Sequence, residues 1–77
     1  MKKIRRGKYR HYKGKEYEVI GVGKHSETRE DLVFYRALYD DKKFGSRALW
    51  ARPVKMFLED VEVDGKVVPR FTYINSK

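Results

Sequence analysis

The densest group of side chains that could do chemistry is the run His25-Ser26-Glu27-Thr28. A histidine beside a hydroxyl and a carboxylate supplies the residue types of a nucleophilic triad. Neighbours along a strand point to opposite faces, however, so His25 and Ser26 diverge unless a turn folds them together. Ser26 also lacks the Gly-x-Ser-x-Gly surroundings of a hydrolase nucleophile. We therefore expect a structured turn whose side chains bond nearby amides, and we keep a small hydrolase using His25 and Glu27 as the most distant alternative.

A metal site is the second chemical possibility. His11 and His25 are the only histidines, and together with Glu27 they could supply three zinc ligands. Nothing in their spacing requires a shared site, and the chain has no cysteine to form a thiolate cluster. We expect no bound metal and no other cofactor.

Aromatic rings interleaved with arginine form the stronger signal. Tyrosine and tryptophan carry a polar group that favours interfaces, and such rings beside arginine suit nucleobase stacking with phosphate contact. The same rings suit a groove for a polyproline peptide, and a solvated basic strand is a third interpretation. Several of the rings must in any case fill the core. The candidate binding residues are Lys8, Tyr9, Arg10, His11, Tyr12, Lys13, His25, Ser26, Glu27, Thr28, Tyr35, Arg36, Trp50 and Arg52.

The charge of the chain is concentrated at its beginning. The formal net charge is +8, from 19 basic and 11 acidic residues. Eight of the 19 basic residues lie within the first 15 residues, which contain no acid, so the other 11 basic residues balance all 11 acids. A basic end attracts phosphate or acidic partners, and the alternative is a solvated tail. We expect any affinity for nucleic acid to come mainly from these first 15 residues.

The candidate residues lie on segments with the pattern of β-strands. Runs rich in aromatic and β-branched residues, Tyr17–Lys24 and Leu32–Tyr39, flank a polar segment and predict a long hairpin with an exposed tip. A strand over Tyr9–Tyr12 precedes them, across a turn in which Gly14 takes a positive φ. Gly21 lies inside a strand, where glycine marks a bulge or a bend. Both faces of the third run are apolar, which predicts a central strand covered on two sides.

Shorter elements follow this hairpin. Ala48–Arg52 predicts a strand that Pro53 ends, and Pro53–Leu58 predicts one helical turn. Asp64-Gly65 between two runs of β-formers predicts a hairpin with a type I′ turn. The last run, Phe71–Ile74, pairs again with the sheet.

Together these elements predict an all-β domain, a small SH3-like and partly open barrel with one short helical or 3₁₀ turn. A small OB-like barrel is the alternative. The 77 residues make one domain, with a flexible basic arm over residues 1–6, the barrel over 7–74 and a tail over 75–77. The residues expected in the core are Val19, Val33, Leu38, Leu49 and Phe57.

Several short motifs are spread along the chain from Gly7 to Tyr73. They are Gly7-Lys8-Tyr9-Arg10-His11-Tyr12-Lys13-Gly14, Tyr17-Glu18-Val19, His25-Ser26-Glu27-Thr28, Val33, Tyr35-Arg36, Leu38-Tyr39, Trp50-Ala51-Arg52-Pro53, Met56-Phe57 and Pro69-Arg70-Phe71. In these motifs the chain resembles a known bacterial family of short uncharacterised proteins, the domain-of-unknown-function 1653 family. The loop over Asp40–Arg47 is longer than the family pattern. The family has no assigned activity, so the resemblance implies membership and no mechanism.

The sequence as a whole predicts a small binding module and not an enzyme. The first expected partner is nucleic acid, as RNA or single strands, held by a basic and aromatic surface. The alternative partner is a protein or peptide, as for an SH3-like adaptor. No apolar run approaches the roughly 20 residues of a membrane span, so we expect no membrane partner. We also expect the protein to be cytoplasmic and monomeric.

Overall fold

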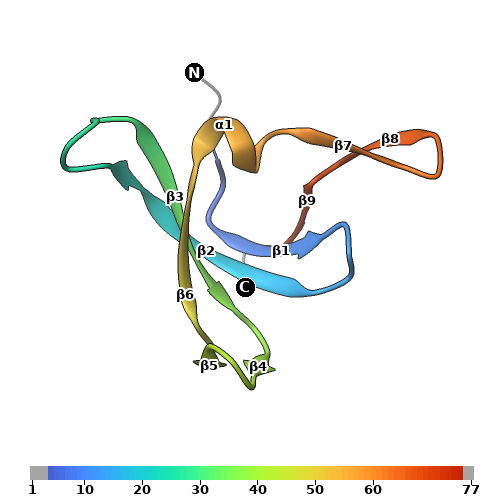
Figure 1. The fold of residues 1–77 in the computed structure, drawn as a ribbon, viewed down its shortest axis with the longest axis horizontal. Coiled ribbons are helices and arrows are strands. Elements are labelled where there is room, and N and C mark those ends of the chain that lie inside the picture. The colour runs from blue at the N-terminus through green and yellow to red at the C-terminus, as the bar shows by residue number, and fades with distance from the viewer. Residues whose placement is uncertain (1–3, 76–77) are drawn as a thin grey trace.

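The computed structural model describes residues 4–75, which fold into short strands around one helical turn (Figure 1). The elements are β1 (Gly7–His11), β2 (Glu16–Lys24), β3 (Asp31–Ala37), β4 (Asp40–Asp41), β5 (Gly45–Ser46), β6 (Leu49–Pro53), α1 (Val54–Phe57), β7 (Asp60–Val63), β8 (Lys66–Pro69) and β9 (Phe71–Asn75). In this part of the chain, no helix is long and apolar enough to cross a bilayer.

Five of the strands form one antiparallel sheet in the order β6-β3-β2-β1-β9. The strands β6 and β9 are its two edges and do not pair with each other, so the sheet does not close into a barrel. Two separate ladders, β4 with β5 and β7 with β8, project from the sheet (Figure 1). The predicted all-β, partly open architecture with one helical turn is confirmed.

Turn chemistry accounts for the connections that the sequence predicted. Gly14 has a φ of 105° in the turn between β1 and β2. Asp64 and Gly65 have φ values of 51° and 78°, and positive φ at both central residues defines the type I′ turn between β7 and β8. The register of β2 against β3 shifts between Val19 and Gly21, which confirms the predicted bulge.

The core lies on one face of the sheet, under α1. Its buried side chains come from four strands and the helical turn, and α1 covers the open side between β6 and β9 (Figure 1). The Phe57 and Phe71 rings stack with centroids 4.2 Å apart, which joins α1 to β9. The buried apolar residues are Tyr9, Val19, Val33, Tyr35, Ala37, Val54, Phe57 and Phe71.

Three expectations about burial were wrong. Leu49 is 66% exposed, because it lies on the outer face of the edge strand β6, opposite Arg36 of β3. The strand β3 is central but covered on one side only, since Val33 is fully buried whereas Phe34 is 38% exposed on the outer face. The Phe34 ring lies over Gly23 of β2, where a Cβ atom would stand only 2.9 Å from Phe34 Cε2. Leu38, also expected in the core, is half-buried.

The described part of the expected N-terminal arm contacts the domain. Ile4 packs against the core, and the Arg5 guanidinium lies 4.2 Å from the centre of the Tyr73 ring. The Arg5 carbonyl accepts a hydrogen bond of 2.8 Å from the Tyr9 hydroxyl. The first three residues of the arm and the last two of the tail lie outside the described residues.

Candidate nucleic-acid interface

The cations on the outer face of the sheet have carboxylate partners. Arg10 Nη2 lies 3.1 Å from a Glu16 carboxylate oxygen, and Lys8 Nζ lies 3.9 Å from the other oxygen of the same carboxylate. Arg36 Nη1 lies 3.9 Å from Glu18 on the neighbouring strand. The register explains these pairs, since Arg10 stands opposite Glu16 and Glu18 opposite Arg36. Acids on β2 thus offset part of the basic charge on β1 and β3.

Two of the predicted stacking rings belong to the core. Tyr9 is 7% exposed and Tyr35 is 4% exposed, so neither ring is free to stack on a base. The Tyr35 hydroxyl accepts a hydrogen bond of 3.2 Å from Arg52 Nε. Tyr9 and Tyr35 do not join Trp50 and Arg52 in an exposed groove, because strand alternation turns both tyrosines toward α1.

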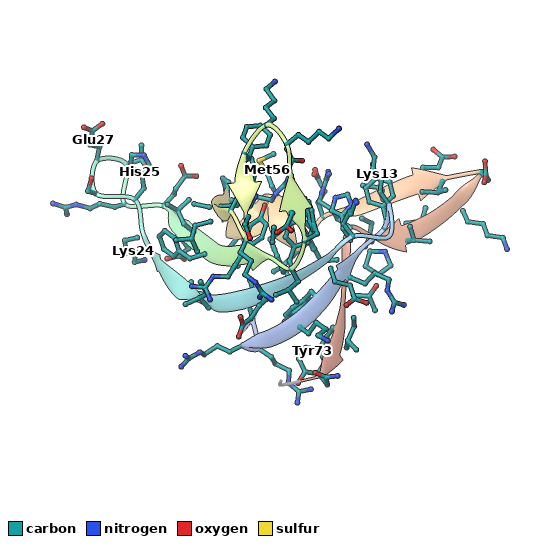
Figure 2. The ribbon with its side chains drawn as sticks, turned by 90° about the horizontal axis from the view of Figure 1, so that it is seen from below. Lys13, Lys24, His25, Glu27, Met56 and Tyr73 are labelled. Atoms are coloured by element: carbon teal, nitrogen blue, oxygen red, sulfur yellow. The ribbon has the colours of Figure 1, made fainter. Side chains whose placement is uncertain are left out.

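The segment His25-Ser26-Glu27-Thr28 forms the structured turn that the sequence predicted. His25 Nδ1 accepts hydrogen bonds from the backbone amides of Glu27 and Thr28, at 3.1 and 3.3 Å. The Thr28 hydroxyl donates to the Glu30 carboxylate at 3.3 Å. This turn lies at the tip of the β2–β3 hairpin, whereas Lys13 lies far from it beside the β7–β8 hairpin (Figure 2). The local bonds account for these residue types without a triad.

The two histidines lie in different parts of the molecule. His11 Nδ1 accepts a hydrogen bond of 3.2 Å from the Lys13 amide, and Lys13 lies far from His25 and Glu27 (Figure 2). The three residues considered as zinc ligands are therefore not brought together. Across residues 4–75, no group of three or more His, Cys, Asp or Glu side chains is placed to hold a metal ion.

A second set of cations lies against aromatic rings instead of carboxylates. Lys13 Nζ lies 5.9 Å from the centre of the Tyr12 ring, and Lys15 Nζ lies 4.8 Å from that of Tyr39. The Arg52 guanidinium lies 5.8 Å from the centre of the Phe71 ring. No ion pair forms at Lys13, Lys15 or Arg52 in the described part of the chain. We call the following set the turn-end cluster: His11, Tyr12, Lys13, Lys15, Tyr39 and Arg52.

His11 lies at the centre of the turn-end cluster. Its ring centre is 4.6 Å from that of Tyr12, 4.9 Å from that of Phe71 and 6.3 Å from that of Tyr17. Burial lowers the pKa of His11, and the positive charges of Arg52, Arg70 and Lys13 lower it further. Since the three cations act on one imidazole, they share a region of positive potential.

Tyr17 joins His11 to Tyr39. The Tyr17 and Tyr39 hydroxyls form a hydrogen bond of 2.6 Å, and their ring centres are 5.5 Å apart. Burial, followed by this hydrogen bond, raises the pKa of Tyr17 well above its usual value, so the phenol stays neutral. Tyr39 and Lys15 were missed as candidates, although the pair of lysines around Gly14 was a visible signal of a basic turn.

Tyr12 is the exposed ring of the cluster, and it stands between two shallow depressions. The first, of about 450 Å³, lies along β1 and β9 and includes Arg10 and Thr72 in its lining. The second, of about 420 Å³, lies against the β7–β8 hairpin and includes Lys66 and Pro69. Tyr12 and Thr72 line both. A flat ligand on the Tyr12 ring could therefore extend into either depression.

Trp50 is half-buried, and another ring covers it. The Phe44 ring meets Trp50 edge to face, with centroids 4.9 Å apart and planes at 77°. Phe44 belongs to the Asp40–Arg47 segment. There, Asp41 Oδ1 accepts hydrogen bonds from the backbone amides of Lys43 and Phe44, at 2.7 and 3.1 Å. This loop therefore limits access to the only tryptophan.

Comparison with known proteins identifies the family. The model of the family described as "Protein of unknown function (DUF1653)" matches residues 7–73. The crystal structure of a DUF1653 protein from Bordetella bronchiseptica is similar to this one, with a TM-score of 0.83 and 34% sequence identity. That similarity covers 92% of this chain and 87% of the other. Comparison with curated proteins gives no match. The chain therefore belongs to the DUF1653 family.

Proposed function

We propose that this protein is a non-enzymatic module that binds single-stranded nucleic acid, RNA in the first place, in the cytoplasm. The observation that supports the proposal is the contrast between its two sets of cations. Lys8 and Arg10 are paired with Glu16, whereas Lys13 and Lys15 face aromatic rings and have no acidic partner in residues 4–75. The turn-end cluster is thus the part of the surface where charge and rings are both available.

The chemistry of the cluster fits a single strand better than a duplex. Phosphates of the backbone contact unpaired lysines and release counterions, which provides affinity without sequence preference. Unstacked bases of a single strand can lie on an aromatic ring, and Tyr12 offers one that is 38% exposed. Because Lys8 and Arg10 form ion pairs on the outer face, we expect them to add less to the affinity for nucleic acid. Of the first 15 residues, those in the turn after β1 should therefore contribute most of this affinity.

A salt titration of RNA binding tests the electrostatic part of this proposal. The double variant Lys13→Ala, Lys15→Ala should flatten the log–log salt dependence by about 1.4 units, if each lysine contacts one phosphate. The control is Lys8→Ala, Arg36→Ala, which removes the same formal charge from side chains that already face Glu16 and Glu18. It should leave the slope unchanged. Equal slopes for both double variants would contradict the assignment of the site.

Replacement of Tyr12 by Ala tests the stacking part. Loss of a stacked base should cost about 1–3 kcal/mol of binding free energy and leave the salt slope unchanged. Phe34→Ala is the matched control, because Phe34 is exposed to the same extent as Tyr12, at 38%, but lies outside the cluster. If mixed single-stranded RNA and DNA show no binding at low salt, the nucleic-acid proposal is rejected.

A peptide partner is the second candidate, supported by the depression against the β7–β8 hairpin. Its lining includes Val63, Val68 and Pro69 together with Tyr12, which resembles an apolar peptide groove. A module of this kind would lose affinity for its peptide in Tyr12→Ala but would depend only weakly on salt. The same titration with the same variants therefore separates the two candidates.

A further inference from the structure

We propose that Arg52, Arg70 and His11 form a binding site for a phosphate group beside the Phe71 ring of β9. The residues come from three separate parts of the chain, and Arg52 and His11 both contact the Phe71 ring. The biological meaning of this phosphate site rests on the proposed function, because the phosphate could belong to a nucleic-acid strand. The site itself can be tested with phosphate alone.

Arg52 presents donors that the protein does not use. Its Nε donates to the Tyr35 hydroxyl at 3.2 Å, which fixes the plane of the guanidinium. Within residues 4–75, this is the one hydrogen bond that the Arg52 side chain makes. Its two terminal nitrogens are not among the buried atoms that lack a partner. Neither terminal nitrogen is therefore used by a protein acceptor in this part of the chain. A planar pair of donors held in this way matches the two oxygens of a phosphate or carboxylate.

Arg70 supplies the second observation, a buried donor with no acceptor. Its Nη2 pairs with a Glu59 carboxylate oxygen at 3.0 Å, but its Nε is buried and has no hydrogen-bond partner in the described part of the chain. An unsatisfied donor on a charged group is costly, so a shift of the Arg70 side chain that exposed this buried Nε to an anion would stabilise the site. An anion is a better acceptor for this purpose than a neutral group.

His11 connects the two arginines and provides a donor of its own. Because His11 Nδ1 accepts the Lys13 amide, the neutral ring carries its hydrogen on Nε2. The Nε2 hydrogen has no acceptor in residues 4–75 and can be donated to an anion without protonation of the ring. Arg52, Arg70 and Lys13 all place positive charge around this ring, and a bound anion would relieve their mutual repulsion.

A phosphate fits this arrangement better than a small anion such as chloride. The Arg52 fork and His11 Nε2 are the donors at hand, Arg70 Nε joins them once its side chain shifts, and a phosphate has enough oxygens to accept from each. The carboxylate of Glu59 balances part of the charge of Arg70, so the site keeps the excess positive charge of Arg52. The phosphate could be free or could belong to a nucleic acid, and the two sources can be separated.

Nuclear magnetic resonance of the two histidines gives a direct test with the full chain. Inorganic phosphate is added at constant ionic strength against sodium chloride. His11 ring resonances should shift and saturate, and those of His25, at the tip of the β2–β3 hairpin, should not move. Arg52→Lys keeps the charge but loses the fork, and it should weaken phosphate binding roughly tenfold or more. Arg10→Lys on the outer face is the control and should bind phosphate as the unaltered chain does.

The outcomes separate this site from the proposed function. No saturating shift of His11, or equal shifts of both histidines, overturns the phosphate site, even if a 5′-hydroxyl oligonucleotide still binds with a steep salt dependence. If Arg52→Lys does not fold, Arg70→Lys provides the same comparison. Tighter binding of a 5′-phosphate than of a 5′-hydroxyl oligonucleotide, lost in Arg52→Lys, identifies a terminal phosphate as the source. Equal binding of the two, with displacement by inorganic phosphate, identifies a phosphate within the strand.

Discussion

His11 shows how much a single residue of this chain depends on its surroundings. In the sequence it is one of two histidines, next to Tyr12 in a basic strand. In the folded chain its ring packs between Tyr12 and Phe71 and lies within reach of the charges of Arg52, Arg70 and Lys13. Burial and these cations favour the neutral imidazole, so the stability of the folded state depends on whether His11 is protonated.

We predict that protonation of His11 destabilises the protein at acid pH. The pKa of His11 is lower in the folded state than its ordinary value of 6.5. Between the lowered pKa and 6.5 the unfolded chain binds more protons, so the free energy of unfolding rises with pH through this window and falls as pH is lowered. His11→Gln should remove this part of the pH dependence, measured as urea midpoints over a pH series. His25→Gln, at the other end of the molecule, is the control and should retain it.

At the scale of elements, the turn between β1 and β2 determines where the cluster residues lie. The His11 amide donates to the Lys15 carbonyl at 2.8 Å, and the Gly14 amide donates to the His11 carbonyl at 2.7 Å. This tight turn places Lys13 and Lys15 on either side of Gly14 and beside the rings of Tyr12 and Tyr39. The geometry of the basic surface therefore follows from a backbone conformation that glycine allows.

We predict that Gly14→Ala destabilises the fold and Gly21→Ala does not. Gly14 has a φ of 105°, where a side chain is strained even though nothing stands within 4 Å of its Cβ position. The cost should be about 1–2 kcal/mol. Gly21 has equally open surroundings but no positive φ, so alanine there should change stability little. Thermal or urea unfolding of the two variants measures the difference, and equal losses would contradict a backbone origin.

At the scale of the whole molecule, side chains close the side of the sheet that hydrogen bonds leave open. The strands β6 and β9 are unpaired edges, and α1 lies over the space between them (Figure 1). Phe57 of α1 stacks on Phe71 of β9 at 4.2 Å and meets Tyr9 of β1 at 5.3 Å. The four-residue helix thus holds the two ends of the sheet together by aromatic packing.

We predict that Phe57→Ala costs about 3–5 kcal/mol of stability, which is a large part of what a small domain has. Phe57 is 2% exposed, so its removal leaves a cavity between α1 and β9. Met56→Ala in the same helical turn is the control, since Met56 is 45% exposed and should cost little. The test is the free energy of urea unfolding of both variants. A similar loss in both would mean that α1 contributes through its backbone and not through this ring.

The local structure of this protein could be predicted from its amino-acid sequence. The Asp64-Gly65 turn, the positive φ of Gly14 and the bulge at Gly21 all follow from what glycine and its neighbours can do, so they could be predicted without any partner. The five main strands and the helical turn after Pro53 followed from β-branched and aromatic runs and the ring of Pro53. The family could also be predicted, because it depends on motifs that are visible in the sequence.

Which face of each strand is covered, and which cations are paired, depends on contacts between segments that are far apart in the sequence. Alternation places Tyr9 and Tyr35 on one face of their strands, but it does not tell whether that face is the core or a groove. The apolar side chain of Leu49 predicted burial. Leu49 is exposed because β6 is an edge strand, and no element among the described residues covers its outer face. The difference between Arg10 and Arg52 arises from register. Arg10 stands opposite Glu16, whereas Arg52 stands opposite Val33 and finds Tyr35 and Phe71 instead of an acid.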